Sequence, residues 1–574
     1  MERAFKNIDA AMGRIKADLV LKNANFINVF TETIDRGDIA IVADTIIGIG
    51  KYTGDVEMDC SDLYVSPGFI DAHVHIESSM IMPEEFAKVV IKKGVTTIIA
   101  DPHEMANIGG MKGISFMIGN SKVAPIDIFF MLPSCVPATK FEDSGYVVNA
   151  EDLKRLMDDD CVLGLGEVMD VPGVVNKDED ILKKIDMATH KHIDGHCPNI
   201  SHRELNACLS CGMRTDHEST NSKEALLKIS MGMYVMLREG SAAKNLKALL
   251  PAVNNNNFGR FLFCTDDRHI DDLLENGSID NCIRISIKQG INPIKAFIMA
   301  SFNAAKCYDL KDRGAIAPGY KADLVIFEDL KGLNIIKVIK DGSEYTELQG
   351  KTNVKLNIKS SMHMDFINSE IFKIKTKSLT EIESKTLVVN VIKLIPNSLE
   401  TKLVQRKIEN ELGYIKKPID KDILKIAVFE RHHNTGRHFV GFIEGLGLKN
   451  CTIAQTIAHD SHNVIVVGDN DKDMEVAVNT LISIGGGIVM VSGGKAIAQL
   501  NLPIGGIMTF EAPYMVAEQL KRLSRIARGF GVRAEYDPFI SLSFMALPVI
   551  PAVKITARGL FDYNKFEFIK LIVK

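Results

Sequence analysis

The sequence of 574 residues predicts an α/β protein whose central part is a (β/α)8 TIM-like barrel, with a small composite β-sandwich domain and an additional C-terminal α/β domain. Three observations support this fold class. Eight short apolar runs alternate with helical stretches between residues 69 and 266, which is the pattern of parallel βαβ units. Side chains suited to metal binding stand at the ends of these runs. Short segments with a similar pattern of turns and strands precede and follow the barrel in the sequence. A doubly wound sheet is the alternative.

The two flanks of the barrel are predicted to form one small β domain. Residues 17–23, 37–42 and 45–50 have the pattern of short strands separated by turn residues, which indicates an antiparallel module. This module has too few residues for a good core of its own. Residues 314–327 form a turn and a strand of the same character. We therefore expect one domain built from residues 1–66 plus 309–345.

The apolar runs of the barrel have the length of buried strands and are too short for core helices. They span residues 69–76, 95–101, 126–132, 162–168, 192–197, 213–217, 233–238 and 260–266. Eight strand and helix units in about 240 residues fit a (β/α)8 barrel. We place this barrel at residues 67–308.

The last part of the chain is predicted to be a separate α/β domain. Residues 345–380 are polar and rich in Lys and Ser, and we expect a connection there. Apolar runs at residues 423–429, 463–468 and 487–491 follow, and the helical pattern of residues 471–483 lies between two of them. Residues 380–574 are assigned to this domain.

The composition of the chain argues against nucleic acid and membranes as partners. The net charge of −5 does not indicate the basic surface of a nucleic-acid-binding protein. Apolar runs fall short of the roughly 18 residues that a membrane span needs. The first residues lack the apolar segment of a secretion signal, so we expect a cytoplasmic protein with no membrane partner. The ten scattered cysteines are expected to be reduced thiols.

His73 and His75 are the first chemical feature of the barrel. They end the first apolar run, which begins after the turn at Pro67 and Gly68. On a strand, residues two apart point to the same side, so the two imidazoles project together. A pair of imidazoles on a rigid strand is a good start for a metal site.

Further ligand-type side chains stand at the ends of other runs. Glu167 ends the fourth run, His196 the fifth, His217 the sixth and Asp266 the eighth. The carboxyl ends of the strands of such a barrel meet at one face. We therefore expect these four side chains to converge with the two histidines of the first run in one metal site.

With these residues in place, the chain resembles the amidohydrolase superfamily, and within it the bacterial adenine deaminases. The superfamily pattern is His-x-His on strand one, a bridging Lys or Glu on strand four, His on strands five and six, and Asp on strand eight. The closer resemblance rests on residues 67–80, 100–106, 164–169, 194–198, 264–267 and 541–551, so it covers most of the chain. Glu167 stands where many binuclear members carry a carboxylated Lys, which disfavours dihydroorotase-like and urease-like functions.

The resemblance implies hydrolytic deamination of adenine to hypoxanthine and ammonia, a purine salvage reaction. It implies two divalent ions, Mn or Fe, while the ligand types also fit Zn. One ion would be held by His73, His75, Glu167 and Asp266, and the other by Glu167, His196 and His217. A hydroxide between the ions would attack C6 of the purine base. Asp266 would take its proton and pass it on.

A purine also needs a proton on a ring nitrogen while C6 becomes tetrahedral, which requires a second acid. Asp101, His103 and Glu104 follow the second run on the same face of the barrel. We expect Glu104 or His103 to be this acid, with Asp101 orienting it. A capped helix start is the structural alternative, with Asp101 as N-cap, Pro102 at the first helical position and Glu104 at the third.

Three further charged residues lie next to the predicted ligands in the sequence or end another run. Arg238 ends the seventh run and is assigned to substrate binding, with a structural salt bridge as the alternative. Asp267 follows a predicted ligand and is assigned to the substrate site, where it can also orient a neighbour. Glu218 follows His217 on the opposite face of a strand, so we expect it to be structural.

Two histidines of the C-terminal domain allow two interpretations. His459 and His462, together with His432, His433 and His438, could form a second metal site. Because the segment leads directly into an apolar run, we favour a loop that covers the barrel mouth and helps to enclose the substrate.

Two other functions compete with adenine deamination. An amidohydrolase or deacetylase acting on a cyclic amide or an N-acyl sugar would use the same metal site. A non-catalytic assembly protein should have lost ligands, whereas all six are present. We expect a homodimer or higher homo-oligomer.

Overall fold

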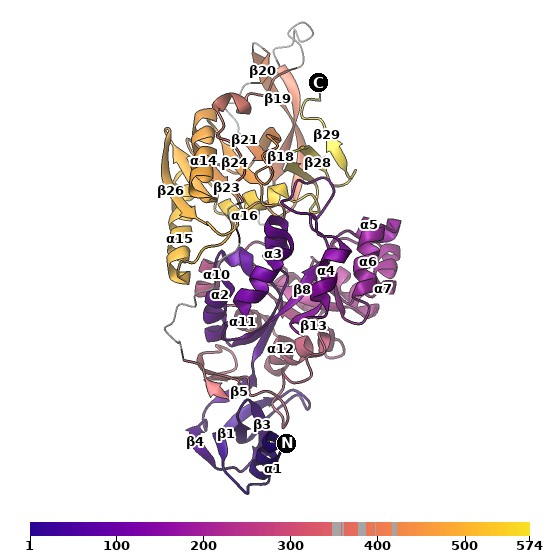
Figure 1. Cartoon of the computed structure of the whole chain (residues 1–574), viewed down its shortest axis with the longest axis vertical. Coiled ribbons are helices and arrows are strands. Elements are labelled where there is room, and N and C mark those ends of the chain that lie inside the picture. Colours follow the sequence, from indigo (N-terminus) through magenta and orange to yellow (C-terminus); the bar gives the residue numbers. More distant parts are fainter. Residues whose placement is uncertain are drawn as a thin grey trace.

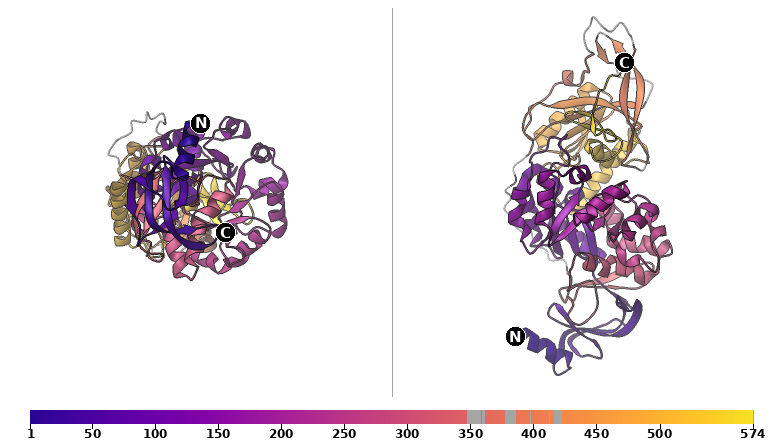
Figure 2. Two further views of the ribbon diagram at one scale, coloured as in Figure 1. Left: turned by 90° about the horizontal axis from the view of Figure 1, so that it is seen from below. Right: turned by 90° about the vertical axis from the view of Figure 1, so that its right-hand side faces the viewer.

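The structure is a computed structural model that describes residues 1–346, 358, 361–376, 386–396, 398–411, 413–415 and 422–573. The molecule is elongated and has three parts in a row, with the barrel between a small β part at the N-terminal end and the C-terminal part at the other end (Figure 1). Seen along its length, the molecule shows the barrel helices as an outer ring (Figure 2). Among the described residues, no helix has the length and apolar character that crossing a membrane would take.

Parallel strands form a closed barrel at the centre. The strands are β6 (Phe69–His75), β7 (Val95–Ala100), β8 (Asp127–Pro133), β9 (Val162–Val168), β10 (His192–Gly195), β11 (Thr215–Asp216), β12 (Tyr234–Arg238), β13 (Phe261–Cys264) and β14 (Asp266–Asp267). Each strand pairs with the next from β6 to β13, and β14 returns to pair with β6. The predicted (β/α)8 barrel is confirmed, since a doubly wound sheet would leave both edge strands unpaired.

The seam of the barrel lies where the last strand is divided. Thr265 separates β13, which pairs with β12, from β14, which pairs with β6. The backbone N–H of Thr265 donates to Asp71 Oδ1 at 3.0 Å, and its hydroxyl group donates to the other oxygen of the same carboxylate. Both residues are buried, and burial raises the pKa of Asp71 to about 6. A side chain on the first strand thus closes the ring where the backbone ladder is interrupted.

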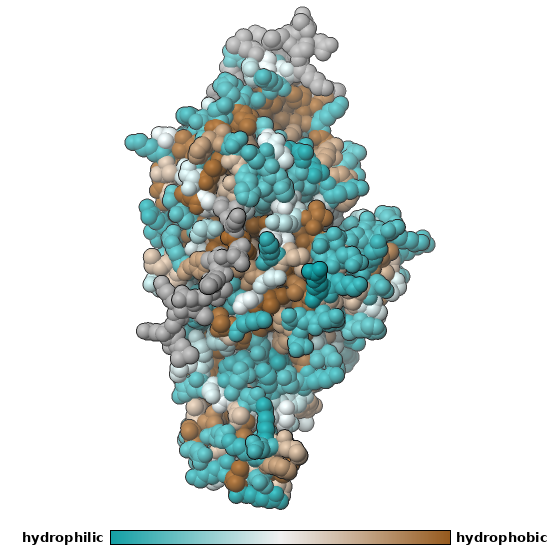
Figure 3. All heavy atoms as spheres, viewed as in Figure 1, coloured by the Kyte–Doolittle hydropathy of each residue, from teal (hydrophilic) through white to brown (hydrophobic). Residues whose placement is uncertain are grey.

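Helices surround the barrel. They are α2 (Pro83–Val90), α3 (His103–Ser121), α4 (Ala150–Met157), α5 (Val171–Asn176), α6 (Glu179–Met187), α7 (His202–Ser210), α8 (Ser222–Ser230), α9 (Leu246–Leu249), α10 (Ile270–Asn276), α11 (Ile279–Lys288), α12 (Pro293–Ala300) and α13 (Phe302–Cys307). Helix α4 shows the local cause: Asn149 and Asp152 form a reciprocal capping box, and Ala150, Leu153 and Met157 are buried at helical spacing. Figure 3 shows a mainly hydrophilic surface over α5, α6 and α7.

Strands from both flanks of the barrel form one sheet. Its order is β17 (Ser343–Glu344), β16 (Ile335–Lys340), β15 (Leu324–Phe327), β5 (Tyr64–Pro67), β1 (Ala17–Asn28), β2 (Thr33–Val42) and β3 (Thr45–Gly50), while β4 (Gly54–Asp59) pairs with β1. Strands β5 and β15 join the two flanks by antiparallel pairing. Apolar side chains of both flanks share a core that includes Leu21, Ile39 and Ile326. Helix α1 (Glu2–Ala11) precedes the sheet.

The C-terminal part is an α/β structure with two sheets. The larger has the order β20 (Tyr414–Ile415), β19 (Thr401–Glu411), β18 (Thr386–Leu394), β22 (His438–Glu444), β21 (Ile423–Phe429), β24 (Val464–Gly468), β23 (Thr452–Gln455), β25 (Gly487–Ser492) and β26 (Lys495–Asn501). The smaller contains β27 (Val553–Thr556), β28 (Gly559–Asp562) and β29 (Glu567–Ile569). The helices are α14 (Asp471–Ile484), α15 (Pro513–Gly529) and α16 (Pro538–Ser543). Helix α14 packs its apolar side chains against β21, β24 and β25.

Most of the connection expected at residues 345–380 lies outside the described residues. Within its described part, residues 361–376 pack against the C-terminal sheet, where Phe372 is fully buried and contacts Phe429 edge to face. This part therefore belongs structurally to the C-terminal domain.

The C-terminal domain covers the carboxyl end of the barrel. The loop of residues 456–463, between β23 and β24, is buried and reaches the start of α3, where His459 lies 2.9 Å from Glu104. Asn463 donates to the carbonyl oxygen of Asp143 in the segment between β8 and α4. The expectation that this loop covers the barrel mouth is confirmed.

Candidate active site

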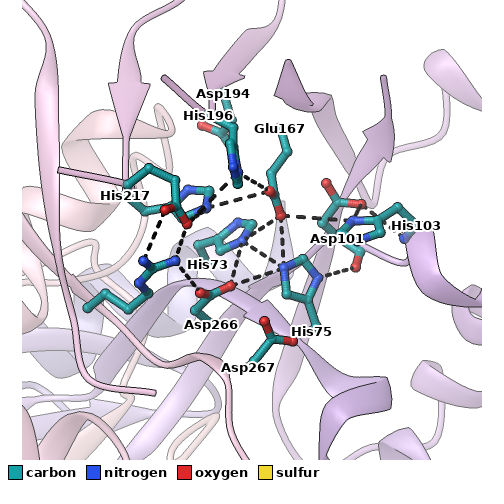
Figure 4. A network of polar contacts seen from close by, with 12 residues as sticks. His73, His75, Asp101, His103, Glu167, Asp194, His196, His217, Asp266 and Asp267 are labelled. Atoms are coloured by element: carbon teal, nitrogen blue, oxygen red, sulfur yellow. Dashed lines mark hydrogen bonds and ion pairs between the residues drawn. The ribbon is translucent and has the colours of Figure 1, made fainter. Parts of the chain in front are cut away.

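The two histidines of β6 face the carboxylates of two other strands (Figure 4). The Nε2 atoms of His73 and His75 lie 3.1 Å apart. Glu167 Oε1, at the end of β9, lies 2.9 Å from the first and 2.8 Å from the second. Asp266 Oδ1, on β14, lies 3.5 Å and 3.1 Å from the same two nitrogens. All four side chains are buried, so this is an enclosed set of imidazole and carboxylate donors.

The second oxygen of Glu167 faces a second pair of histidines. Its Oε2 atom lies 2.8 Å from His196 Nδ1, beyond β10, and 3.5 Å from His217 Nε2, beyond β11. The ring of His217 also stacks on that of His73 at 4.3 Å between centroids. The structure thus brings all six predicted ligands together and places one carboxylate between two pairs of imidazoles.

These residues fit divalent cations. His75 Nδ1 lies 3.0 Å from the carbonyl oxygen of Asp101, and when it donates there the lone pair of Nε2 is left to face the carboxylates. Glu167 Oε1 and His196 Nε2 are buried without a hydrogen-bond partner among the described residues, a situation that is costly unless another group satisfies them. Imidazole and carboxylate donors of this kind suit divalent transition metals.

The field at the cluster also favours a cation. Burial alone would lower the pKa of His73, but the carboxylate of Glu167, followed by that of Asp266, outweighs it and raises the pKa to about 10. The same carboxylates raise the pKa of His75 against the opposing effect of burial. A buried site that attracts protons this strongly offers the same negative potential to a metal ion.

Asp266 has an unusual backbone conformation. Its φ of 55° lies in the left-handed region, which is uncommon for residues other than glycine. This turn follows directly after Thr265, where the barrel strand is interrupted. Arg238 Nη1 donates to Asp266 Oδ2 at 2.7 Å, so one carboxylate oxygen faces the histidines and the other faces a cation. Both alternatives for Arg238 are compatible with its position, because it also lines the chamber next to the cluster.

Glu218 lies at the site, and the expectation that it points away was wrong. Its Oε1 atom is 3.6 Å from His217 Nε2 and 4.0 Å from His196 Nδ1, and it forms an ion pair with Arg238. Strand β11 ends at Asp216, so His217 and Glu218 no longer follow the alternation of a strand. The prediction failed because it extended the strand by two residues.

The residues after β7 form the rim of the chamber. Helix α3 begins at His103 with Pro102 as its N-cap, one residue later than the capped-helix alternative proposed. The carboxylate of Asp101 nevertheless accepts the backbone N–H of His103 at 3.1 Å. Glu104 lines the chamber and accepts a hydrogen bond from Ser78 at 3.2 Å. Asp267 is also within hydrogen-bonding distance of Ser78 Oγ, so the single hydrogen of this hydroxyl group is shared between two predicted site residues.

The roof of the chamber comes from the C-terminal domain. Its lining residues there are Leu399, His459, Asp460, Phe544, Leu547 and Ile550. The space in the chamber is about 30 Å³, and an adjoining cleft of about 360 Å³ shares His196, Glu218 and Arg238 with it. The sequence pointed to a covering loop at His459. Residues 541–551, which supply Phe544, Leu547 and Ile550, carried part of the family resemblance, but neither they nor Asp460 were assigned to the site.

Comparisons with known proteins show which families the chain is similar to. The profile of the family described as "Amidohydrolase family" matches residues 64–344, and that of the "Adenine deaminase C-terminal domain" matches residues 398–567. The adenine deaminase of Clostridium acetobutylicum is 49% identical to this chain over 98% of this chain and 99% of its own length. Adenine deaminase 2 of Carboxydothermus hydrogenoformans is 46% identical over 98% of both chains. Among solved structures, a β-aspartyl dipeptidase of Fervidobacterium islandicum AW-1 covers 59% of this chain and 99% of its own, with 18% identity and a TM-score of 0.44.

The barrel, the ligand cluster at its carboxyl end and the family match define a metal-dependent hydrolase of the amidohydrolase family. Identity of 41–49% over nearly the whole chain narrows the class further. The chain belongs to the adenine deaminase family.

Proposed function

We propose that this chain hydrolyses adenine to hypoxanthine and ammonia. Its relatives are named adenine deaminases, which indicates this reaction for them. One observation carries the proposal: Glu167 places one carboxylate oxygen against His73 and His75 and the other against His196 and His217. A carboxylate in this position can be shared by two cations. Similarity to these relatives extends over nearly the full length of the chain, and it supports adenine as the substrate over a cyclic amide or an N-acyl sugar.

We further propose a binuclear centre of Mn or Fe, with Zn compatible with the same donors. The first ion would be held by His73, His75, Glu167 and Asp266, and the second by Glu167, His196 and His217. When bound, the ions supply positive charge that acidifies a water molecule, so that a hydroxide nucleophile is available near neutral pH.

The chain itself would manage the protons. Attack at C6 of adenine moves the C6–N1 electron pair onto N1, which must then receive a proton. Glu104 and His103, the two candidates for this acid, both line the chamber, and Asp101 lies next to His103 and would orient it. Of the two we propose Glu104 as the donor. Asp266, whose carboxylate is held by Arg238, would take the proton of the attacking oxygen and hand it to the departing amine.

The remaining assignments are also proposals. Arg238 and Asp267 would contact the base, since both line the chamber. The apolar side chains of Phe544, Leu547 and Ile550 would cover the purine ring and exclude bulk water. We keep the domain boundaries 1–66 plus 309–345, 67–308 and 380–574, a cytoplasmic location, and a homodimer or higher homo-oligomer as predictions.

The direct test is an assay with defined products. Protein purified from cells grown with manganese is incubated with adenine, adenosine, cytosine and an N-acetyl sugar, and ammonia, hypoxanthine and acetate are measured. We expect ammonia and hypoxanthine in equal amounts from adenine alone. Turnover of another substrate with adenine inert would contradict the proposal.

Glu167→Gln tests the shared carboxylate. The amide keeps the size of the side chain but removes the charge that both sites use, so metal content should fall below two ions per chain and activity should drop by at least about 100-fold. Glu151→Gln, on the exposed side of α4, is the matched control and should keep both properties. Full metal content and activity in Glu167→Gln would refute the bridging role.

A further inference from the structure

The loop of residues 456–463 brings two charged side chains onto the rim of the barrel. His459 Nδ1 lies 2.9 Å from Glu104 Oε1, and Asp460 Oδ2 lies 3.7 Å from His103 Nε2. Glu104 and His103 are the two residues that begin α3. Consecutive residues of one domain therefore face consecutive residues of the other, at the position where the proposed function requires an acid.

The ring of His459 is held on several sides. It stacks on Phe544 at 4.4 Å between centroids with an angle of 28° between the planes. Its backbone N–H donates to Ser543 Oγ at 3.4 Å. The side chain is 7% exposed, and Glu104 is 2% exposed. This imidazole is therefore fixed by the C-terminal domain with its Nδ1 atom directed at the carboxylate.

The charged and titratable groups facing His459 are Glu104 on α3, Asp267 on β14, and Asp460 and His462 on its own loop. Burial would lower the pKa of His459, but Glu104 and Asp267 outweigh it and raise the pKa to about 9. Burial lowers the pKa of His462 to about 3, so that ring stays neutral. For Glu104, burial opposes ionisation, but His459 outweighs it and holds the pKa below its usual range.

Glu104, His459 and His462 also have the composition of a metal site, but the hydrogen bonds argue against one. The backbone N–H of Ala458 donates to His462 Nδ1 at 3.3 Å, which uses the lone pair of that nitrogen. In a neutral ring the proton is then on Nε2, the atom that faces Glu104 at 3.7 Å. An N–H group is no ligand, so the cluster holds a proton in preference to a metal.

We propose that His459 is a positioning residue that fixes the carboxyl group of Glu104 over the substrate chamber and supplies it with a proton in each turnover. The inference rests on the proposed role of Glu104 as the acid for the ring nitrogen. The catalytic apparatus then extends from the barrel to the C-terminal domain, because His459 lies 355 residues after Glu104 in the sequence.

The proton balance is simple. As the C6–N1 electron pair moves onto N1, the proton shared by His459 and Glu104 passes to N1. The Nδ1–H bond of His459 breaks and an O–H bond forms on Glu104. This O–H bond then breaks as an N–H bond forms on the base. His459 is left neutral and Glu104 remains a carboxylate. Water releases one proton to the solvent when it becomes hydroxide, and His459 takes one proton back from the solvent after the transfer, so the cycle is balanced.

His459→Asn is the decisive variant. The amide N–H of Asn can still donate a hydrogen bond to Glu104 but cannot transfer its proton at neutral pH. The substitution therefore keeps the contact and removes the transferable proton. We expect kcat to fall about 100-fold or more while KM changes less than about threefold, in the range of general acid catalysis. His459→Ala should lose the contact as well and raise KM further.

The pH profile separates a proton role from a structural one. Wild-type kcat should decline at alkaline pH as His459 loses its proton, and this decline should be absent from the low remaining activity of His459→Asn. Metal content of two ions per chain and an unchanged midpoint of thermal unfolding are required of the variant. His438→Asn, in β22 of the same domain and not at the chamber, is the control and should behave as wild type.

The outcomes distinguish two failures. A wild-type protein with full metal content that does not deaminate adenine would overturn the proposed function. Active wild-type protein with unchanged kcat and an unchanged alkaline limb in His459→Asn would overturn this inference alone. If Glu104→Gln keeps full activity while His459→Asn loses it, the histidine acts on another group and the inference is likewise overturned.

Discussion

Lys554 shows how a single residue can carry a large electrostatic cost. Its side chain is completely buried in β27, and its ammonium group donates to the carbonyl oxygen of Leu399 at 2.8 Å. Burial lowers its pKa from the usual 10.5 to about 7, with Glu400 only partly opposing the shift. Leu399 in turn lines the substrate chamber. The free-energy cost of burying this charge therefore falls on a residue, Lys554, whose hydrogen bond holds Leu399 of the roof in place.

Lys554→Met should change how stability depends on pH. Between pH 7 and 10.5 the unfolded chain binds this proton and the folded chain does not, so the lysine makes wild-type stability rise with pH by up to about 1.4 kcal/mol per unit. Methionine fills similar volume without a charge, so the variant should be more stable near pH 7 and lose this rise. Midpoints of thermal unfolding at pH 7, 8 and 9 measure it.

The control for this prediction is Lys565→Met, an exposed lysine between β28 and β29. It should leave the slope of stability against pH as in wild type. Identical slopes in wild type and Lys554→Met would show that the buried lysine does not titrate in this range.

At the scale of elements, the closure of the barrel depends on a side chain as well as on strand pairing. Asp71 on β6 accepts both the N–H and the hydroxyl hydrogen of Thr265. Thr265 lies between β13 and β14, and the next residue is the proposed ligand Asp266 in its left-handed conformation. The seam of the barrel and one carboxylate of the candidate metal site therefore share a single hydrogen-bonded joint.

Asp71→Ala should weaken this joint. It leaves the buried N–H of Thr265 without its acceptor, at a cost of about 1–3 kcal/mol. The midpoint of thermal unfolding should fall and metal affinity should fall with it, because Asp266 is no longer held in place. Thr265→Val, which removes only the hydroxyl hydrogen bond, should lie between wild type and Asp71→Ala. An unfolding midpoint equal to wild type in Asp71→Ala would contradict this account.

The elements of the barrel were predictable from sequence to a greater extent than the site. The alternation of apolar runs with helical stretches identified all eight strands, because parallel strands buried on both faces consist of continuous apolar residues. It failed at β11, where only Thr215 and Asp216 pair, and this error placed Glu218 on the wrong side. Strand periodicity cannot predict the side of residues that have already left the strand.

At the scale of the whole molecule, the C-terminal domain is fastened to the barrel next to the chamber. Asp143, between β8 and α4, accepts from Arg437 at 2.5 Å and from Arg558 at 2.7 Å. The carbonyl oxygen of the same residue accepts from Asn463 at 2.7 Å, and Asn463 ends the loop that carries His459. The sequence predicted that this loop covers the barrel mouth, but sequence patterns describe local structure and could not identify Asp143 and the residues that bind it.

Asp143→Ala should loosen this fastening without affecting the metal ligands. The ion pairs are partly exposed and contribute about 1 kcal/mol, so a two- to fivefold loss of kcat/KM is expected. Hydrogen exchange in residues 456–463 should accelerate while exchange in β6 and β9 stays as in wild type. Asp9→Ala, which breaks an exposed ion pair with Arg14 beyond α1, is the control. Unchanged exchange in the loop would show that other contacts hold it.

The division of the site between two domains also has a consequence for how the protein is made. All six proposed ligands precede residue 267, so they have been translated before half of the chain is complete, whereas His459 and the roof follow much later. At about 5–20 residues per second, roughly 10–40 s separate the synthesis of Asp266 from that of His459, and roughly 15–60 s separate it from the last roof residue, Ile550. During that interval a nascent barrel can acquire metal but has neither a closed chamber nor the histidine partner of Glu104. Products of interrupted translation would then bind metal without turning over substrate, and activity would mark only finished chains.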